Sequence, residues 1–289
     1  MVFRNGIRIA LGVLARMIRE KRVAAFSLLV ILLVFLSAFL APLLTPYGEE
    51  EMDLLARLAP PSIAHPLGTD EGGRDLLTRL FYGSRISLLV GVVPTLLSMA
   101  LGAFLGILAG YAGGVTDTVI MRLADLMLAF PSMLLAMVIL YTLGGGLGNV
   151  FLTLTLVNWA GVARVVRSET LRLKESEFVE AARTMGVSRG KIMLRHILPN
   201  CFPTLMVLFT LNVPTSILTE SSLSFLGMGI QPPRASWGQM VNQGGPYLTV
   251  APWLCFVPGL AIMVVVLSFH FLGDGLRELL DPHEKSGGV

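Results

Sequence analysis

The chain has 289 residues, of which 54% are hydrophobic and only 14% charged, and its mean hydropathy is +0.74. A water-soluble protein of this length has too little interior to bury so much apolar side chain, and disordered chains are poor in hydrophobic residues. The 22 Lys and Arg residues and 19 Asp and Glu residues give a net charge of +3, which does not indicate a nucleic-acid-binding protein. The composition therefore predicts one all-α, polytopic membrane domain over residues 1–289.

Six apolar stretches follow one another along the chain, most of them close to the length of about 20 residues that crosses a bilayer as a helix. Helices are expected because lipid offers backbone N–H and C=O groups no other partner. The first stretch is longer than the apolar core of about 7–15 residues in a cleavable signal peptide, so it is expected to remain as a span. The expected spans lie within residues 23–48, 88–111, 126–143, 147–163, 200–219 and 250–273.

Basic residues are distributed unevenly between the segments that join these spans. Seventeen Lys and Arg residues lie on one side and five on the other, and the richer side is expected to be cytoplasmic. This predicts a multi-pass protein of the cell (inner) membrane with both termini in the cytoplasm. The cytoplasmic segments would be an N-terminal tail (1–22), a loop (164–199) with eight basic residues, and a C-terminal tail (274–289).

Several kinds of chemistry have no counterpart in the sequence. The expected spans contain no Asp, Glu, Lys or Arg, which argues against a secondary transporter or channel that works alone. Gly190 and Lys191 lack the other residues of an ATP-binding loop, and the histidines do not have metal-ligand spacing. No nucleophile or metal set supports a membrane enzyme. His270 is the only titratable ring near a span core, and it is expected to be a hydrogen-bonded interface residue, with a proton relay as the alternative.

Three glycines repeat every four residues along the second expected span: Gly102, Gly106 and Gly110. Small residues at this spacing allow two helix backbones to approach closely. The helix that lies against this stripe belongs either to the same chain or to a partner subunit.

The stretch 168–200 has the pattern of two short helices separated by a glycine. Ser176 is expected to cap the first helix, and Gly186 is expected to end it, because glycine readily adopts the conformation common at helix C-termini. A second helical segment is expected from 188 towards 198, with Pro199 at the start of the fifth span. One small apolar face of the first helix, flanked by charge, is expected to hold Phe178, Ala182 and Met185.

Two interpretations of this first helix remain open. Ala181 and Ala182 are small enough to allow another protein to approach closely, so the helix and its glycine stop would form a rigid knob for a partner. An ordinary surface helix that rests on lipid headgroups has the same pattern.

The same stretch resembles the EAA motif of ABC importer permeases. Glu180-Ala181-Ala182 is followed after three residues by Gly186, and after nine more by the position before Ile197-Leu198-Pro199. The general pattern has isoleucine where this chain has His196, but Arg195 to Asn200 is similar to the dipeptide, oligopeptide and nickel branch. Further segments that resemble the C-type (DppC/OppC-like) permeases of this branch are 65–75, 129–131, 223–227, 236–238 and 273–282. The resemblance covers about residues 20–283.

This resemblance implies a type I ABC importer permease fold with six transmembrane helices and no catalysis of its own. It implies a second homologous permease, two cytoplasmic ATPase subunits that bind ATP and Mg, and an extracytoplasmic substrate-binding protein. This chain would contact membrane lipid and hold no cofactor or metal. The contact with the ATPase would be made by Phe178, Glu180, Ala181, Ala182, Met185 and Gly186.

The resemblance also gives expectations for the cargo and for the outside face. Di- and oligopeptides are the expected cargo, with nickel or another small solute as the alternative, and the substrate-binding residues are not predicted. Segments 45–84 and 220–249 would face the substrate-binding protein. For the second segment the alternative is an interfacial or re-entrant stretch anchored by Trp237.

Overall fold

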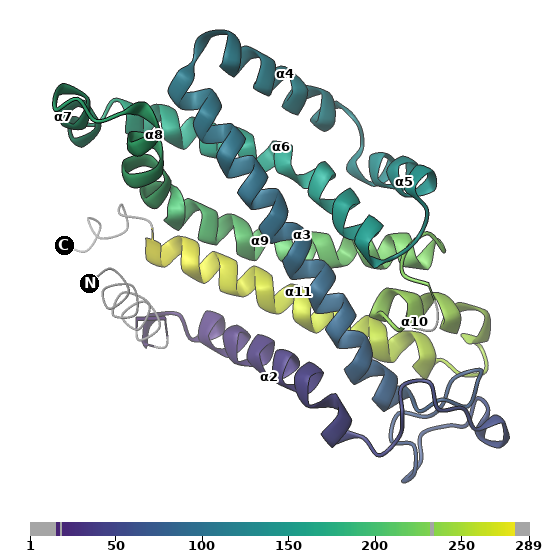
Figure 1. Ribbon diagram of the computed structural model, residues 1–289. Helices are drawn as coiled ribbons and strands as arrows, with labels where there is room; N and C mark the ends of the chain where they lie inside the picture. The colour runs from purple at the N-terminus through teal and green to yellow at the C-terminus, as the bar shows by residue number, and fades with distance from the viewer. Residues whose placement is uncertain (1–15, 18, 232–233, 281–289) are drawn as a thin grey trace.

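The structure is a computed structural model that describes residues 16–17, 19–231 and 234–280, and this part is almost entirely helical (Figure 1). Five helices are long and apolar enough to cross a membrane, and a bent pair of helices makes a sixth span if it crosses as one unit. The five are α2 (Arg22–Leu44), α3 (Leu76–Ala112), α6 (Leu147–Lys174), α9 (Leu198–Phe225) and α11 (Trp253–Leu280); the bent pair is α4 (Gly114–Ala129) and α5 (Ser132–Leu143).

Shorter helices complete the two ends of the bundle. The α7 end carries α7 (Glu177–Thr184) and α8 (Arg189–Ile192), together with the start of α2 and the end of α11 (Figure 1). The opposite end, here called the α10 end, carries α10 (Trp237–Gly244) and the loop that leads into α3. Two 3₁₀ turns, Leu54–Ala56 and Gly245–Tyr247, also lie between the long helices.

The expectation of one continuous third span over 126–143 is wrong. α4 and α5 meet at an angle of 93°, and the break falls at Phe130 and Pro131. Proline has no N–H to donate and its ring excludes the helical conformation from the preceding residue. Phe130 is accordingly extended, with φ of −92° and ψ of 142°.

Several helices continue beyond the ends that hydropathy predicts. α6 runs to Lys174, so residues 164–174 of the expected cytoplasmic loop are helical, and α11 runs to Leu280 through part of the expected tail. α9 runs to Phe225 and therefore contains Glu220, which lies one residue beyond the expected span of 200–219. Most of both expected tails (1–15, 18 and 281–289) and Pro232 and Pro233 lie outside the described residues.

The start of the fifth span differs from the expectation for a similar reason. α8 leads into α9 through a π-helical turn, Met193–Ile197, so that the helix begins at Arg189 and not at Pro199. Pro199 cannot donate a backbone hydrogen bond, and the side chain of Asn200 donates to the carbonyl of His196 at 2.6 Å. The chain thus continues as a helix across the proline.

The glycine stripe lies on α3 against α6 of the same chain. A Cβ added to Gly102 would come within 2.7 Å of the Trp159 carbonyl oxygen, and one added to Gly106 within 2.5 Å of that of Ala163. A Cβ on Gly110 would lie 2.8 Å from the Cβ of Thr170. Of the two partners left open by the sequence, the structure places the helix of this chain against the stripe.

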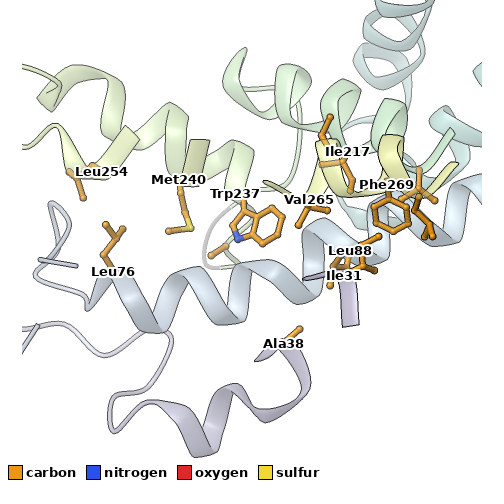
Figure 2. Packing of buried hydrophobic residues seen from close by; sticks show 14 of the residues in the cluster. Ile31, Ala38, Leu76, Leu88, Ile217, Trp237, Met240, Leu254, Val265 and Phe269 are labelled. Atoms are coloured by element: carbon orange, nitrogen blue, oxygen red, sulfur yellow. The ribbon is translucent and has the colours of Figure 1, made fainter. Parts of the chain in front are cut away.

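A hydrophobic core along the bundle joins α2, α3, α9, α10 and α11, and at the α10 end it surrounds the indole of Trp237 (Figure 2). The side chain of Trp237 is 2% exposed, and its Nε1 donates to the Leu80 carbonyl at 3.0 Å. The interpretation of Trp237 as an anchor at the membrane interface is therefore wrong. Trp237 instead fixes α10 on α3, because both its indole and its backbone N–H bond to α3. The backbone N–H of Trp237 donates to the Ser87 hydroxyl at 3.0 Å.

Candidate functional site

The helix predicted as a knob is α7, which projects from the bundle beyond the ends of the long helices (Figure 1). Glu177 and Glu180 lie in its first turn and Arg183 in its last, where each charge complements the helix dipole. After the helix, Gly186 has φ of +74°, and its N–H donates to Arg183 O at 2.9 Å while Val187 N–H donates to Ala182 O at 3.0 Å. These two bonds form a Schellman motif, so the glycine ends α7 as predicted.

The exposed side of α7 differs from the predicted apolar face. Phe178 and Met185 are 42% and 75% exposed, but Ala182 is only 1% exposed. Ala182 therefore lies on the inner side of the helix, where it packs beside Val179, and cannot contact a partner in this conformation. Glu180 and Ala181 are exposed together with Phe178 and Met185.

Ser176 stands at the N-cap position of α7, as expected, but its side chain does not make the capping bond. Its hydroxyl donates to the Leu173 carbonyl at 2.6 Å and makes no capping bond to α7. The bond holds the short connection between α6 and α7 in place, because it ties the residue before α7 to the last turn of α6.

A second hydrophobic core holds the inner side of α7 on the bundle. Val179 and Ala182 are buried with residues from α3, α6, α8 and α9, including Tyr111, Val166 and Ile192. An eight-residue helix is not stable alone in water, so this packing gives α7 its rigidity.

Basic residues of α6 are paired with α4 near the same end. Arg167 contacts the Asp117 carboxylate through two nitrogens, each 2.5 Å from an oxygen, and Arg164 lies 2.7 Å from Asp125. Bidentate arginine–carboxylate pairs fix orientation as well as charge. These pairs explain why α6 continues as a helix beyond the apolar stretch that hydropathy detects.

At the α10 end, residues 45–75 form an ordered loop cap, and Asp70 is its centre. The Oδ1 atom of Asp70 accepts hydrogen bonds from the backbone N–H groups of Gly72 and Arg74 at 2.8 and 3.0 Å. Its Oδ2 lies 2.6 Å from Arg74 Nε and 2.9 Å from Arg79 Nη1. Arg79 also donates to the Gln243 side chain at 3.1 Å, so this carboxylate connects the loop cap to α3 and, through Arg79, to α10.

Asp75 begins α3 from within the same loop cap. One carboxylate oxygen accepts from the Thr78 N–H at 2.8 Å, as an N-cap, and the other lies 3.0 Å from the His65 Nδ1. A Cβ on Gly73 would come within 1.7 Å of the Asp53 carbonyl oxygen, so only glycine fits there. These bonds account for the residue pattern of segment 65–75.

Sequence reasoning missed Glu220, which is fully buried on α9. Its Oε1 accepts from the hydroxyls of Ser224 at 2.6 Å and Ser236 at 2.9 Å, and Ser236 in turn caps α10. Oε2 has no hydrogen-bond partner among the described residues. The expected span ended at Thr219, one residue too early to include this carboxylate.

Neither His270 nor the groove between α3 and α9 presents a cluster of polar groups in the part of the chain that the structure describes. His270 is half-buried and makes no hydrogen bond to any described residue, so the expected hydrogen-bonded role is wrong. A groove of about 750 Å³ between α3 and α9 is lined by apolar side chains such as Met99, Phe104 and Phe202. Within the described ranges, no group of three or more His, Cys, Asp or Glu residues could hold a metal ion.

Comparison with known proteins agrees with this architecture. Residues 102–286 match the family described as "Binding-protein-dependent transport system inner membrane component", and residues 12–61 match the N-terminal TM domain of oligopeptide transport permease C. Oligopeptide transport system permease protein OppC of Bacillus subtilis is 39% identical, covering 91% of this chain and 87% of that protein. Dipeptide transport system permease protein DppC of Alkalihalophilus pseudofirmus is 42% identical, covering 94% and 89%.

A further relative and a solved structure extend the comparison. Glutathione transport system permease protein GsiD of Pectobacterium atrosepticum is 43% identical, covering 94% of this chain and 90% of that protein. A chain of the MetNI methionine ABC transporter in an inward-facing conformation has a TM-score of 0.58 at 19% identity and covers 70% of this chain and 97% of that chain. The chain therefore belongs to the family of inner membrane components of binding-protein-dependent transport systems, and it is a permease of the ABC importer type.

Proposed function

We propose that this permease serves an ATP-driven importer of di- and oligopeptides and is coupled to its ATPase through α7. In this proposal the α7 end and both termini lie in the cytoplasm, and the loop cap and α10 lie outside. The distribution of basic residues supports this orientation, because segments rich in Lys and Arg remain on the cytoplasmic side.

The observation that carries the coupling role is the exposed surface of α7. Phe178 and Met185 are large apolar side chains that remain 42% and 75% exposed on a helix outside the bundle. Such a patch is typical of a protein–protein contact. Glu180 and Ala181 complete the proposed contact surface, Gly186 sets the turn that ends it, and Ala182 supports it from the inner side.

In this proposal the chain is one part of a larger assembly. A second homologous permease completes the translocation pathway, and two cytoplasmic ATPase subunits bind ATP and Mg. Closure of the ATPase pair displaces α7 and opens the pathway towards an extracytoplasmic substrate-binding protein. ATP drives this change because a conformational equilibrium shifts only when a ligand binds the two states with different free energies.

The names of the relatives support peptides as the cargo. The three relatives described above are named for oligopeptide, dipeptide and glutathione transport, and all three of these solutes contain peptide bonds. A nickel chelate is the alternative cargo for the same machinery, and uptake assays distinguish the two.

Reversing the charge of Glu180 tests the coupling role. We expect Glu180→Lys to lower the substrate-stimulated ATP turnover of the reconstituted complex about tenfold, because a reversed charge inside an interface meets like charge. Gly186→Val is expected to have a similar effect, since a β-branched residue does not tolerate φ of +74°. Full stimulated turnover with either variant would contradict the role of α7.

The matched control is Arg122→Glu, another charge reversal on a residue whose side chain is 80% exposed on α4; it should leave turnover unchanged. Cargo is tested in vesicles that contain the complex and its substrate-binding protein. Labelled dipeptide should enter only with ATP, whereas uptake of nickel in its place would refute the peptide assignment. Uptake by this chain alone would refute the whole proposal.

A further inference from the structure

Tyr111 lies at the point where α3 meets the core beneath α7. It is the second-last residue of α3 and is 8% exposed. Its ring belongs to the same buried cluster as Val179 and Ala182, the two residues on the inner side of α7. The aromatic ring thus lies where α3 meets the proposed contact helix.

Two cations from two other helices face this ring. The guanidinium carbon of Arg183, on α7, lies 5.3 Å from the ring centroid, and the Lys174 ammonium, at the end of α6, lies 5.9 Å from it. Both distances are within the range of a cation–π interaction. The negative face of the ring attracts both cations, so it stabilises the contact of α3 with α7 and with the end of α6.

The helix that carries Tyr111 reaches the other end of the bundle as one helix with Pro94 in its interior. α3 has 37 residues, which corresponds to about 55 Å, and it begins at Asp75 in the loop cap. The two residues after its C-terminal end, Gly113 and Gly114, have φ of +68° and +55°, so α4 starts in a new direction. α3 therefore joins the position of Tyr111 to the loop cap through one helix.

We propose that the ring of Tyr111 is a positioning element that transmits the displacement of α7 to α3 through its cation–π contact with Arg183. This inference rests on the proposed coupling of α7 to an ATPase. In this proposal Phe178 and Glu180 contact the ATPase. Tyr111 and Arg183 connect α7 to α3, the helix that reaches the loop cap.

The test compares Tyr111→Phe with Tyr111→Leu in the reconstituted complex with its ATPase and substrate-binding protein. Phenylalanine keeps the aromatic face, and leucine keeps apolar bulk without it. We expect Tyr111→Leu to lower the number of solute molecules transported per ATP hydrolysed at least fivefold, and Tyr111→Phe to retain the wild-type ratio. A purely structural role would lower the thermal stability of the complex and leave this ratio unchanged.

A second pair of variants changes the cation and leaves the buried ring intact. Arg183 is exposed, so the Arg183→Gln variant should fold normally. This variant should lower the number of solute molecules transported per ATP hydrolysed, as Tyr111→Leu does. Arg183→Lys keeps the positive charge and should retain the wild-type ratio. The double variant should be no worse than either single one, because both remove the same interaction. Additive losses would instead indicate that Arg183 acts on the ATPase directly, and would overturn the inference.

Two further outcomes separate this inference from the proposal on which it rests. If the wild-type complex couples transport to ATP and Tyr111→Leu couples equally well, the inference alone is wrong. If no ATPase copurifies with the wild-type chain and α7 variants have no effect, the proposed function is wrong and the inference fails with it.

Discussion

Replacing Gly106 with alanine is expected to destabilise the protein by about 2 kcal/mol or more, although alanine is the better helix former. The added methyl group would lie 2.5 Å from the Ala163 carbonyl oxygen and 3.0 Å from the Arg167 backbone nitrogen. Both atoms belong to the backbone of α6 and cannot turn aside, so the two helices must separate, with the cost typical of overpacking. Thermal unfolding of the purified protein in detergent measures the effect.

Gly161 provides the matched control for this substitution. It lies on α6, the same helix that Gly106 contacts, but a Cβ added there meets no atom within 4 Å. Gly161→Ala should therefore be neutral or slightly stabilising through helix propensity. Equal midpoint temperatures of thermal unfolding for Gly106→Ala and Gly161→Ala would contradict the close packing of α3 on α6.

Substitution of Asp70 with asparagine is expected to disorder the loop cap, at a cost of about 3–5 kcal/mol. The variant keeps the size of the side chain but removes the charge that Arg74 and Arg79 share, and these arginines are only 7% and 2% exposed. Arg79 would lose its paired carboxylate, whereas Arg74 would retain its 3.2 Å contact with Glu71. A buried cation that loses its counter-ion is strongly unfavourable. Hydrogen exchange over residues 45–79 should rise, together with a lower thermal midpoint.

The neighbouring carboxylate gives a control for the loss of one negative charge in the loop cap. Glu71 is 26% exposed and makes a single contact of 3.2 Å with Arg74, so Glu71→Gln should cost less than about 1 kcal/mol. If the backbone amides of the loop cap exchanged hydrogen no faster in the Asp70→Asn variant than in the Glu71→Gln variant, Asp70 would not be the organising residue of the loop cap.

Hydropathy predicted the presence of the spans but not where they end. The fourth expected span stopped at Ala163 because Arg164 and Arg167 follow, yet both arginines are paired with acidic residues of α4. Such pairing depends on tertiary structure and leaves no local signal. Glu220 was missed for a related reason, since the hydroxyl of Ser236, sixteen residues away, is one of the two groups that satisfy its Oε1.

Other errors did have a signal in the sequence. The break in the third span could have been predicted from Pro131, which excludes a helical conformation at Phe130. The orientation of α7 could have been corrected by Val179, because Val179 and Ala182 are three residues apart and form the inner side of the helix. Gly186 was predicted correctly because its role depends only on local backbone conformation.

The bend between α4 and α5 has a consequence for how the chain enters the membrane during synthesis. α4 has 16 residues and α5 has 12, and α5 is only about 18 Å long, against about 30 Å of hydrocarbon. Each of the two helices is shorter than the roughly 20 residues that cross a bilayer, and Asp117 and Asp125 on α4 pair with Arg167 and Arg164 of α6. We therefore expect α4 and α5 to enter the lipid as one unit, after α6 and its two arginines have been synthesised.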